Sequence, residues 1–320
     1  MQSYNTMFRW GILGTANISR TIIEALQLTE NGAPYAIASR SIKKAEEWQS
    51  LYGIQKAYGS YPELLDCGEI DAVYIPLPNS MHAEWCLKAI GKGIPVLCEK
   101  PFALNSSQAA KVAKASEKSG VTVAEAFMYR FHPLYDKVLE VISEGKIGKL
   151  STIFSRFTFM LDDPESISAN PELGGGAIMD VGCYCVNMSR LITGAEPIRT
   201  SAFAFGKNVD ETMTGMLEFP DGVLAHFETS ISNFERHYAE IAGTEGVITI
   251  ESPWFPGDKE ARFTLRTGSG NEIITTPGAN CYVLELEDFM DALRNRRPPR
   301  WRMDDAVKNM AVIDALYNAM

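Results

Sequence analysis

The first 127 residues alternate short apolar runs with longer segments in which apolar residues recur at helical spacing. The apolar runs predict strands at 8–13, 35–38, 72–75, 96–98 and 122–124. The longer segments predict helices at 18–28, 42–52 after a capping Ser41, 81–90 and 107–118. Strands that alternate with helices in this way form a parallel sheet covered on both faces. We therefore expect an α/β domain in this half of the chain.

After residue 127 the pattern changes to a series of strand-like segments. A helix over 134–144 is followed by predicted strands at 151–159, 200–205, 212–219, 223–230, 238–242, 247–251, 262–266 and 272–276. Asp221-Gly222, set between two of these strands, is a strong hairpin signal. Two helices, at 281–295 and 304–319, complete the chain. This half therefore predicts an α+β domain with a large, mostly antiparallel open sheet.

The length of the chain agrees with this division. A chain of 320 residues exceeds what one compact core usually holds, so two domains are expected. We place the α/β domain at 1–127 and the α+β domain at 128–320.

Charge and composition limit the classes of partner. A net charge of −10 argues against nucleic-acid binding, which needs a dense cationic face. Five arginines between 294 and 302 are the one basic cluster, and Pro298-Pro299 interrupts it, which favours a surface loop. No apolar run approaches the ~18 residues of a membrane span, and the opening residues lack the apolar core of a signal peptide, so a cytoplasmic protein is expected. The six cysteines and four histidines show no metal-ligand spacing, and no metal is predicted.

A strand-to-helix turn at 10–19 has the character of a dinucleotide site. Read against the pattern GxGxxG, it keeps Gly14 and places Ala16 and Ser19 at the other two positions, so the motif alone is weak. Backbone amides and the helix dipole can hold a pyrophosphate at such a junction. A generic tight turn is the alternative explanation.

The end of the second predicted strand bears on the choice of cofactor. NAD sites usually carry Asp or Glu there, whereas this chain has Ser39, Arg40 and Ser41, followed by Lys43 and Lys44. A cation and hydroxyls suit a 2′-phosphate, which favours NADP over NAD. The alternative is that Ser41 only caps a helix and that the basic residues form a solvated face.

Two further stretches suggest proton transfer beside that cofactor. Lys100 follows an apolar strand, and Asp180 and Tyr184 lie four residues apart at the start of a predicted helix. A tyrosine hydroxyl has a pKa near ~10, and a neighbouring ammonium group favours its ionised form. Lysine, aspartate and tyrosine together therefore predict a proton-handling site, although a surface lysine, a helix-dipole partner and a core aromatic residue would explain them separately.

These stretches occur in a characteristic order. The chain carries Gly11 to Ser19, Pro78-Asn79-x-x-His82, Glu99-Lys100-Pro101, Tyr129-Arg130-Phe131-His132-Pro133 and Gly174-Gly175-Gly176 followed by Asp180-Val181-Gly182-Cys183-Tyr184. In this order the sequence resembles the Gfo/Idh/MocA oxidoreductases over essentially its whole length. It is most similar to the branch that contains dimeric dihydrodiol dehydrogenase, glucose-fructose oxidoreductase and NADP-dependent aldose dehydrogenases.

The resemblance implies a Rossmann dinucleotide-binding domain at 1–127, a substrate-binding and dimerisation domain at 128–320, and a reaction. Lys100 and Tyr184 are implied as the catalytic pair, with Asp180 beside them, and hydride would pass between nicotinamide C4 and a small sugar, polyol or vicinal diol, or the matching carbonyl compound. Tyrosine rather than histidine at 184 points to the dihydrodiol and aldose-oxidising branch. The open sheet of the second domain would pair copies of the chain as a homodimer or homotetramer. Several relatives carry an arginine in the loop where this chain has Ser166 to Asn170, so substrate contacts on that loop are not implied.

The predicted site residues fall into two sets. The cofactor set is Gly11, Gly14, Thr15, Ala16, Asn17, Ile18, Ser39, Arg40, Lys44, Pro76, Pro78, Asn79, His82, Glu99 and Lys100. The substrate set is Lys100, Arg130, Phe157, Asp180 and Tyr184.

Several of these roles stay open. His82 has helix capping as an equal alternative. Glu99 holds the strand end or the nicotinamide region, and Arg130 and His132 touch either substrate or only the seam between domains. A non-catalytic sensor on the same fold is the alternative function, whereas a hydrolase that uses Cys183 or Cys185 lacks a histidine nearby in the sequence.

Overall fold

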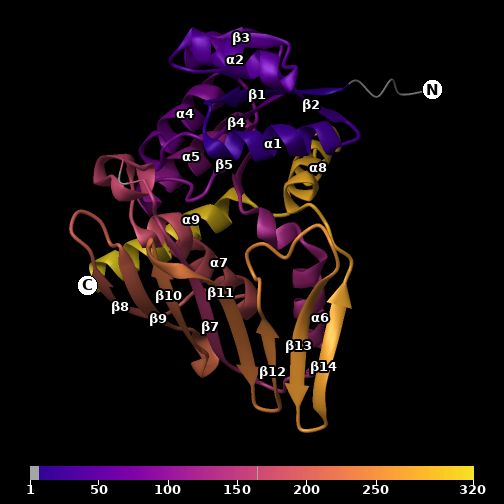
Figure 1. Cartoon of the computed structure of the whole chain (residues 1–320), viewed down its shortest axis with the longest axis vertical. Coiled ribbons are helices and arrows are strands. Elements are labelled where there is room, and N and C mark those ends of the chain that lie inside the picture. The colour runs from indigo at the N-terminus through magenta and orange to yellow at the C-terminus, as the bar shows by residue number, and fades with distance from the viewer. Residues whose placement is uncertain (1–6, 164) are drawn as a thin grey trace. The chain divides into compact units, whose positions relative to one another are not determined.

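The computed structural model describes residues 7–163 and 165–320, and the first six residues, where a signal peptide would begin, lie outside it. The chain forms two compact units (Figure 1). The N-terminal unit contains Met1–Phe127 and Tyr282–Val307, and the C-terminal unit contains Met128–Cys281 and Lys308–Met320.

The N-terminal unit is built on a parallel sheet. In the described part of the chain this sheet has six strands in the order β3-β2-β1-β4-β5-β6, and each neighbouring pair is parallel. The strands are β1 (Phe8–Leu13), β2 (Gly32–Ala38), β3 (Lys56–Tyr58), β4 (Ala72–Ile75), β5 (Val96–Glu99) and β6 (Val123–Ala126). The predicted α/β architecture is confirmed, with β3 as a strand that the pattern did not indicate.

Helices connect these strands, and their ends follow local sequence signals. They are α1 (Asn17–Leu28), α2 (Ile42–Tyr52), α3 (Tyr61–Leu65), α4 (Asn79–Gly91) and α5 (Ser106–Ser119). The Asn105 side chain accepts the Gln108 N–H at the start of α5. Gly53 and Gly120 end α2 and α5 in the left-handed conformation.

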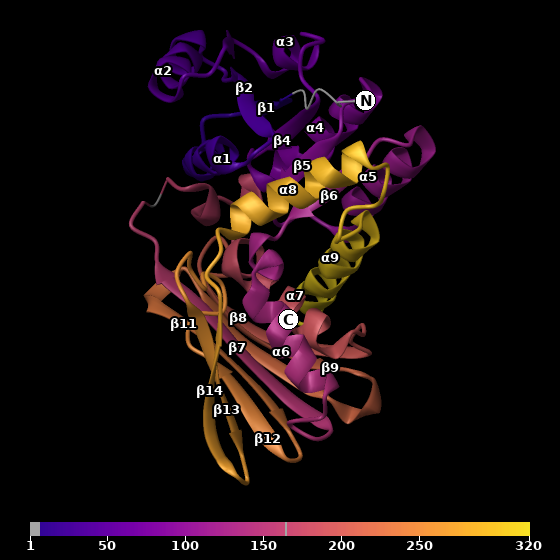
Figure 2. The ribbon, with the colours of Figure 1, turned by 90° about the vertical axis from the view of Figure 1, so that its right-hand side faces the viewer.

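A helix from far along the chain completes the core of the N-terminal unit. Helix α8 (Cys281–Arg294) lies beside the parallel sheet (Figure 2), and its Phe289 ring is 5.5 Å from that of Trp10 in β1. Leu286 and Met290 join the same buried cluster. The compact unit thus differs from the predicted range 1–127 because three apolar side chains of α8 are buried against β1 and α1 rather than in the second domain.

The C-terminal unit is built on the large open sheet. Its strands are β7 (Leu150–Met160), β8 (Arg199–Phe205), β9 (Thr212–Glu218), β10 (Leu224–Ser230), β11 (Ser232–Gly243), β12 (Gly246–Ile250), β13 (Ala261–Thr267) and β14 (Gly270–Thr276). Among the described residues the order is β14-β13-β12-β11-β7-β10-β9-β8, and every pair is antiparallel except β7 with β10. The predicted hairpin joins β9 to β10, with φ of +62° at Asp221 and +77° at Gly222.

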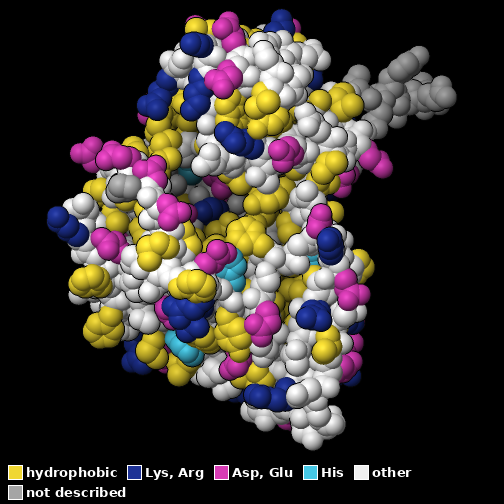
Figure 3. All heavy atoms as spheres, in the orientation of Figure 1, with side chains coloured by type: hydrophobic (Ala, Val, Ile, Leu, Met, Phe, Trp, Pro, Cys, Tyr) yellow, Lys and Arg dark blue, Asp and Glu magenta, His cyan; other side chains and the backbone are white. Residues whose placement is uncertain are grey.

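One face of this sheet carries helices. Helices α6 (Pro133–Ser143) and α7 (Cys183–Thr193) pack on it, together with the later residues of α9 (Met303–Asn318) (Figure 2). Along β9 and β10 the side chains alternate between buried and exposed, as expected when one face of the sheet packs on helices and the other does not. Figure 3 shows apolar side chains among charged ones and histidines over this sheet.

The described residues also bear on the predictions about membranes, metals and cysteines. No described helix has the length and apolar character needed to cross a membrane. Within 7–163 and 165–320 no three His, Cys, Asp or Glu side chains are grouped to hold a metal ion. The six cysteines are free thiols, and burial raises the pKa of Cys185 to about 12, which makes it a poor nucleophile at neutral pH.

Candidate active site

The turn between β1 and α1 has the backbone that a phosphate site requires. Gly14 has φ of +123°, which residues with side chains rarely adopt, and its N–H donates to the Ala38 carbonyl at 2.9 Å. The Ser19 hydroxyl closes the turn by donating to the Gly14 carbonyl at 3.1 Å. Ala16 stands at the N-cap and offers no side-chain acceptor, so the first amides of α1 are not capped by it. The helix N-terminus is therefore available to an anion.

Other members of the predicted cofactor set near this turn differ in whether they reach the surface. Thr15, Asn17 and Ile18 reach the surface of this turn. Gly11 instead lies buried inside β1, where an added Cβ would come within 2.7 Å of the Leu64 side chain. Its lack of a side chain serves the packing of α3 on β1.

The end of β2 presents basic side chains to solvent. Ser39 is buried, whereas Arg40 and Lys44 are exposed. Ser41 occupies the N-cap of α2, yet its side chain makes no capping hydrogen bond. Ser41 is therefore at the capping position, but the explanation that its hydroxyl caps the helix is wrong.

Lys100 follows β5 on a segment held from three sides. The Tyr74 hydroxyl of β4 donates to Glu99, whose second oxygen accepts the Lys100 N–H at 3.2 Å. The buried Glu125 of β6 accepts the Phe102 N–H at 2.8 Å. Burial and the Glu99 carboxylate raise the pKa of Tyr74, so Tyr74 remains a donor. Glu99 thus braces the strand end that carries Lys100.

The third anchor is His82 of α4. Its ring has no exposed surface, and its nitrogens lie 2.9 Å from the Pro101 carbonyl and 2.7 Å from the Leu77 carbonyl. Both carbonyls favour the protonated ring, but burial is the larger effect and lowers the pKa of His82 to about 4. A cofactor contact by His82 stays a prediction. Both nitrogens face backbone carbonyls, and the neutral ring donates its single N–H to one of them, so the ring lies between the segment after β4 and the segment after β5.

These residues share one edge of the parallel sheet. The Gly14 turn, Ser39-Arg40, the Pro76 to Asn79 segment and Glu99-Lys100 follow the carboxyl ends of β1, β2, β4 and β5. Those strands are consecutive in the order β2-β1-β4-β5. Ligands of open α/β sheets bind at this edge, so these members of the predicted cofactor set lie where such a ligand is expected.

Tyr184 begins the helix that packs on the larger sheet. A π-helical turn, Ile178–Gly182, precedes α7, so a wider turn than the regular α-helix predicted from the spacing connects Asp180 to Tyr184. The Tyr184 side chain is buried, with its hydroxyl 3.8 Å from the Met128 sulfur. Asp180 is half-buried, and its Oδ2 accepts the Ser168 hydroxyl at 2.6 Å.

Four aromatic residues form a cluster with Tyr184. The Tyr129, Phe157 and Trp254 rings lie 5.7, 5.4 and 5.7 Å from the Tyr184 ring. Trp254 stacks on Phe157 at 9° and donates its indole N–H to the Arg156 carbonyl at 2.9 Å. Phe255 meets Phe157 edge-on at 5.9 Å. The predicted substrate residue Phe157 therefore does contact Tyr184, within an apolar wall that sequence reasoning did not assemble.

A carboxylate anchors the glycine-rich approach to this helix. Asp210 accepts the Ile178 N–H and the Tyr317 hydroxyl, each at 2.8 Å, and its backbone carbonyl accepts the Ala177 N–H at 2.6 Å. Gly176 has φ of +118°, and a Cβ there would lie 2.2 Å from the Asp210 carboxylate. The chain can pass this close only because residue 176 is glycine.

Arg130 and His132 lie in and directly after the 3₁₀ turn Met128–Phe131. Arg130 is buried in that turn. His132 caps α6: its Nδ1 accepts the Leu134 N–H at 3.0 Å, and its Nε2 lies 3.0 Å from the Gly257 carbonyl. These contacts anchor His132 within the C-terminal unit, a role that the sequence did not suggest, and its contact with substrate or with the seam between domains stays a prediction.

Ser168, Asp210 and Trp254 were missed from the sequence. Ser168 lies in a short 3₁₀ turn and the other two lie in loops, and each has a partner that is distant along the chain or on another element, so no periodic pattern identifies them. Lys100 belongs to the N-terminal unit and Tyr184 to the C-terminal unit, and their pairing stays a prediction.

Comparison with known proteins supplies the family. Residues 8–127 match the model described as oxidoreductase family, NAD-binding Rossmann fold, and residues 135–249 match the GFO/IDH/MocA C-terminal domain. The chain belongs to the GFO/IDH/MocA oxidoreductase family.

Relatives of this GFO/IDH/MocA protein include named dehydrogenases. It is 38% identical over 317 residues to D-xylose 1-dehydrogenase (NADP(+)) 2 of Haloferax volcanii, covering 97% of this chain and 96% of that protein. It is 34% identical over 269 residues to trans-1,2-dihydrobenzene-1,2-diol dehydrogenase of Xenopus laevis, covering 80% and 81%. The predicted family, α/β fold and dehydrogenase or reductase class are confirmed.

A solved structure adds a cofactor-bound example. The crystal structure of a 3-ketoreductase from Actinomadura kijaniata with NADP and TDP-benzene has a TM-score of 0.92 and 25% identity, covering 98% of each chain. The prediction of a nicotinamide dinucleotide cofactor is confirmed for the family.

Proposed function

We propose that this protein is an NADP-preferring oxidoreductase that moves a hydride to or from a carbon of a small sugar, polyol or vicinal diol, or the matching carbonyl compound. The observation that carries the proposal is the Lys100 segment, fixed by Tyr74 through Glu99, by His82 and by Glu125 at the carboxyl edge of the parallel sheet. A lysine whose backbone is held in this way, on the same sheet edge as the Gly14 turn, suits chemistry at a bound dinucleotide.

The cofactor residues fit the group. The uncapped N-terminus of α1 and the left-handed Gly14 suit the pyrophosphate, and exposed Arg40 and Lys44 suit a 2′-phosphate. The relatives that act with NADP or hold it support the same preference. When bound, the nicotinamide supplies the hydride acceptor or donor.

In this proposal Tyr184 moves the proton. In oxidation its oxygen takes the proton of the substrate hydroxyl as the carbon that bears it loses hydride, and in reduction it returns that proton. Lys100 remains an ammonium group that favours the ionised tyrosine. Asp180, held by Ser168, binds a further substrate hydroxyl, and Phe157 with Arg130 bounds the substrate.

The relatives guide the choice of substrate for the test. D-xylose and a trans-1,2-diol are the compounds to assay first, because curated relatives are named for a pentose and a cyclic diol. Reduction of NADP⁺ and NAD⁺ is followed at 340 nm, in parallel with cofactor titration. Tyr184→Phe and Lys100→Met should each lower turnover by about 10²- to 10⁴-fold with cofactor affinity largely intact.

Tyr238→Phe provides a matched control, since it removes a tyrosine hydroxyl that bonds Glu240 on the other side of the sheet. Near-wild-type turnover in either active-site variant would refute the roles of Lys100 and Tyr184. Tight cofactor binding without turnover on sugars, diols, dicarbonyls or keto-sugars would instead favour a non-catalytic sensor.

We also propose that a second copy of the chain covers the outer face of the large sheet. Phe203 and Phe205 of β8 and Met216 of β9 are exposed there, beside a shallow hollow of about 220 Å³ lined in part by Leu224. Light scattering during gel filtration would detect a dimer or tetramer, and Phe203→Lys should shift it to the monomer. A monomeric wild type would contradict this assembly.

A further inference from the structure

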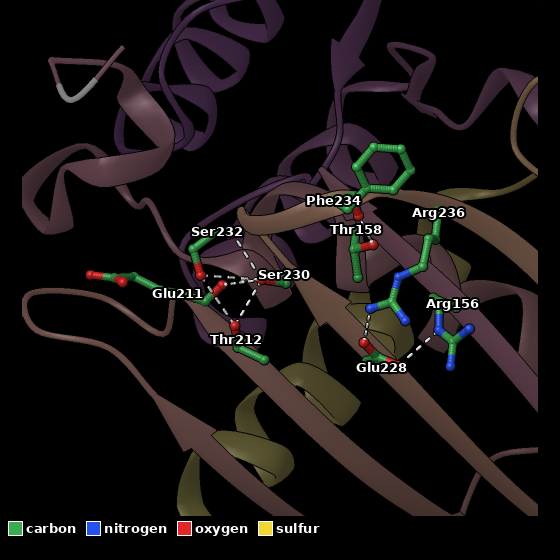
Figure 4. Close-up of polar contacts among 9 residues, drawn as sticks. All are labelled: Arg156, Thr158, Glu211, Thr212, Glu228, Ser230, Ser232, Phe234 and Arg236. Atoms are coloured by element: carbon green, nitrogen blue, oxygen red, sulfur yellow. Dashed lines mark hydrogen bonds and ion pairs between the residues drawn. The ribbon is translucent and has the colours of Figure 1, made fainter. Parts of the chain in front are cut away.

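Strand β11 carries an irregularity next to the aromatic cluster. Its pairing with β7 runs from Arg236 opposite Thr158 to Ser232 opposite Met160, so three residues of β11 face the single Phe159. The Thr158 hydroxyl fixes this bulge by donating to the Phe234 carbonyl at 2.7 Å (Figure 4). Bulges redirect side chains and are frequent beside active sites.

The residue that emerges from the bulge onto the helix-bearing face is His237. It lies opposite Phe157 in the register, and the two rings meet edge-on at 4.7 Å. The Phe255 ring is 5.6 Å away. Since Phe157 also contacts Tyr184 at 5.4 Å, one phenyl ring joins His237 to the proposed acid/base.

His237 differs from its neighbours in keeping a polar, accessible side chain. Trp254 is fully buried and Phe157 nearly so, whereas the His237 side chain is 16% exposed and Phe255 is 44% exposed. The Glu235 carboxylate, set beside it by the bulge, lies 3.7 Å from Nε2, beyond hydrogen-bond range. Burial lowers the pKa of His237, an effect larger than the opposing one of Glu235, so the ring is neutral at pH 7.

The other histidines are committed elsewhere. The ring nitrogens of His82 and His132 all face backbone groups. His226 stacks on Phe154 at 4.7 Å on the outer face of the sheet. His237 thus contacts the aromatic wall. Among the hydrogen bonds of the described residues, neither of its ring nitrogens bonds a backbone group.

We infer that His237 is a substrate-specificity residue that binds a hydroxyl group of the substrate away from the reacting carbon. The inference rests on the proposed function, because it needs Tyr184 to mark the reacting end. A neutral imidazole offers one donor and one acceptor, which is the complement of a hydroxyl. The Phe157 ring meets the imidazole edge-on and the Phe255 ring lies tilted against it, so little side-chain entropy is lost when a hydroxyl binds. The preferred substrate therefore carries at least one hydroxyl beyond the pair at the reacting end.

The test compares two substrates in two variants. D-xylose has the additional hydroxyls, and trans-1,2-cyclohexanediol lacks them. His237→Phe keeps an aromatic ring and removes the hydrogen-bonding atoms, whereas His237→Gln keeps a donor and an acceptor. We expect His237→Phe to lower kcat/KM for D-xylose about tenfold, mainly through KM, and to leave the diol within about twofold. His237→Gln should recover most of the activity on D-xylose.

A matched control variant and the wild-type protein separate the role of His237 from the proposed oxidoreductase function. His226→Phe makes the same change on the outer face and should leave the ratio of the two substrates unchanged. Equal losses on both substrates in His237→Phe, or no loss, would overturn the role of His237 while wild-type turnover upholds the proposed function. Absence of wild-type turnover and of calorimetric D-xylose binding to the NADP-loaded protein would reject both.

Discussion

The Tyr317 hydroxyl, three residues from the last residue of the chain, donates a 2.8 Å hydrogen bond to the Asp210 carboxylate. The same carboxylate holds the Ile178 N–H at the start of the turn that leads to Asp180 and Tyr184. The end of the chain thereby helps to fix the segment that carries the proposed acid/base.

Removing this hydroxyl should cost stability and turnover together. In Tyr317→Phe, the Asp210 carboxylate keeps the Ile178 N–H and loses the tyrosine hydroxyl. We therefore expect the free energy of unfolding to fall by about 1–2 kcal/mol. We also expect a lower kcat with an unchanged NADP dissociation constant. Urea unfolding and steady-state kinetics measure the two effects, and Tyr238→Phe serves as the half-buried counterpart on the outer face of the sheet. A stability loss with unchanged kcat would show that Asp210 does not position Tyr184.

Arg40 should distinguish the two cofactors. If its guanidinium binds a 2′-phosphate, Arg40→Ala weakens NADP by about tenfold or more and leaves NAD nearly unaffected. Fluorescence titration of both cofactors provides the measurement. Arg20→Ala is the control, because Arg20 lies over the Trp48 ring at 5.5 Å on the neighbouring surface. Equal losses for NADP and NAD would refute the 2′-phosphate assignment.

Replacing Gly14 should weaken cofactor binding as well as strain the backbone. Gly14→Ala places a Cβ at φ of +123° and 3.3 Å from Leu77, so a stability cost of about 1–3 kcal/mol is expected, together with weaker NADP binding. Gly53→Ala also strains a left-handed residue, but its added Cβ meets nothing within 4 Å. Only the Gly14 variant should change the NADP dissociation constant, and an equal effect of both would contradict a pyrophosphate turn.

His82 should make stability depend on pH. Its pKa is about 4 in the folded chain, against an ordinary value of 6.5, so the unfolded state binds the proton first as pH falls. The stabilisation is fully present above pH 6.5 and is lost as pH falls toward 4, by up to about 3 kcal/mol. Urea unfolding between pH 4 and 7 should show this slope, reduced in His82→Asn. An unchanged slope in the variant would assign it to other groups, among them His132, His226 and His237, whose pKa values are also lowered by burial.

The sequence predicted those elements whose residues repeat at strand or helix spacing. Strands β1 and β4 and helix α2 have the predicted bounds, because continuous apolar runs or amphipathic spacing mark them. Strand β3, Lys56–Tyr58, has one charged and two partly buried residues and lies at the sheet edge, so no pattern marks it. The early part of β11 was missed because the bulge interrupts its alternation.

The candidate site was predictable to a similar extent. Gly14, Arg40 and Lys100 follow strand ends, and strand ends can be located from one sequence. Asp210 meets Tyr317 across 107 positions and His237 meets Phe157 across β11 and β7, contacts that depend on register and on a bulge. Local patterns carry no information about such pairings.

Helix α8 has a consequence for the order in which the protein is made. The side chains of Leu286, Phe289 and Met290 fill the core around Trp10, yet they are synthesised after every strand of the larger sheet. A nascent chain therefore exposes the apolar surface of its first unit until translation has passed residue 290, and a fragment of 1–127 lacks the side chains that cover that surface. The core of the N-terminal unit can therefore close only after helix α8 has been synthesised.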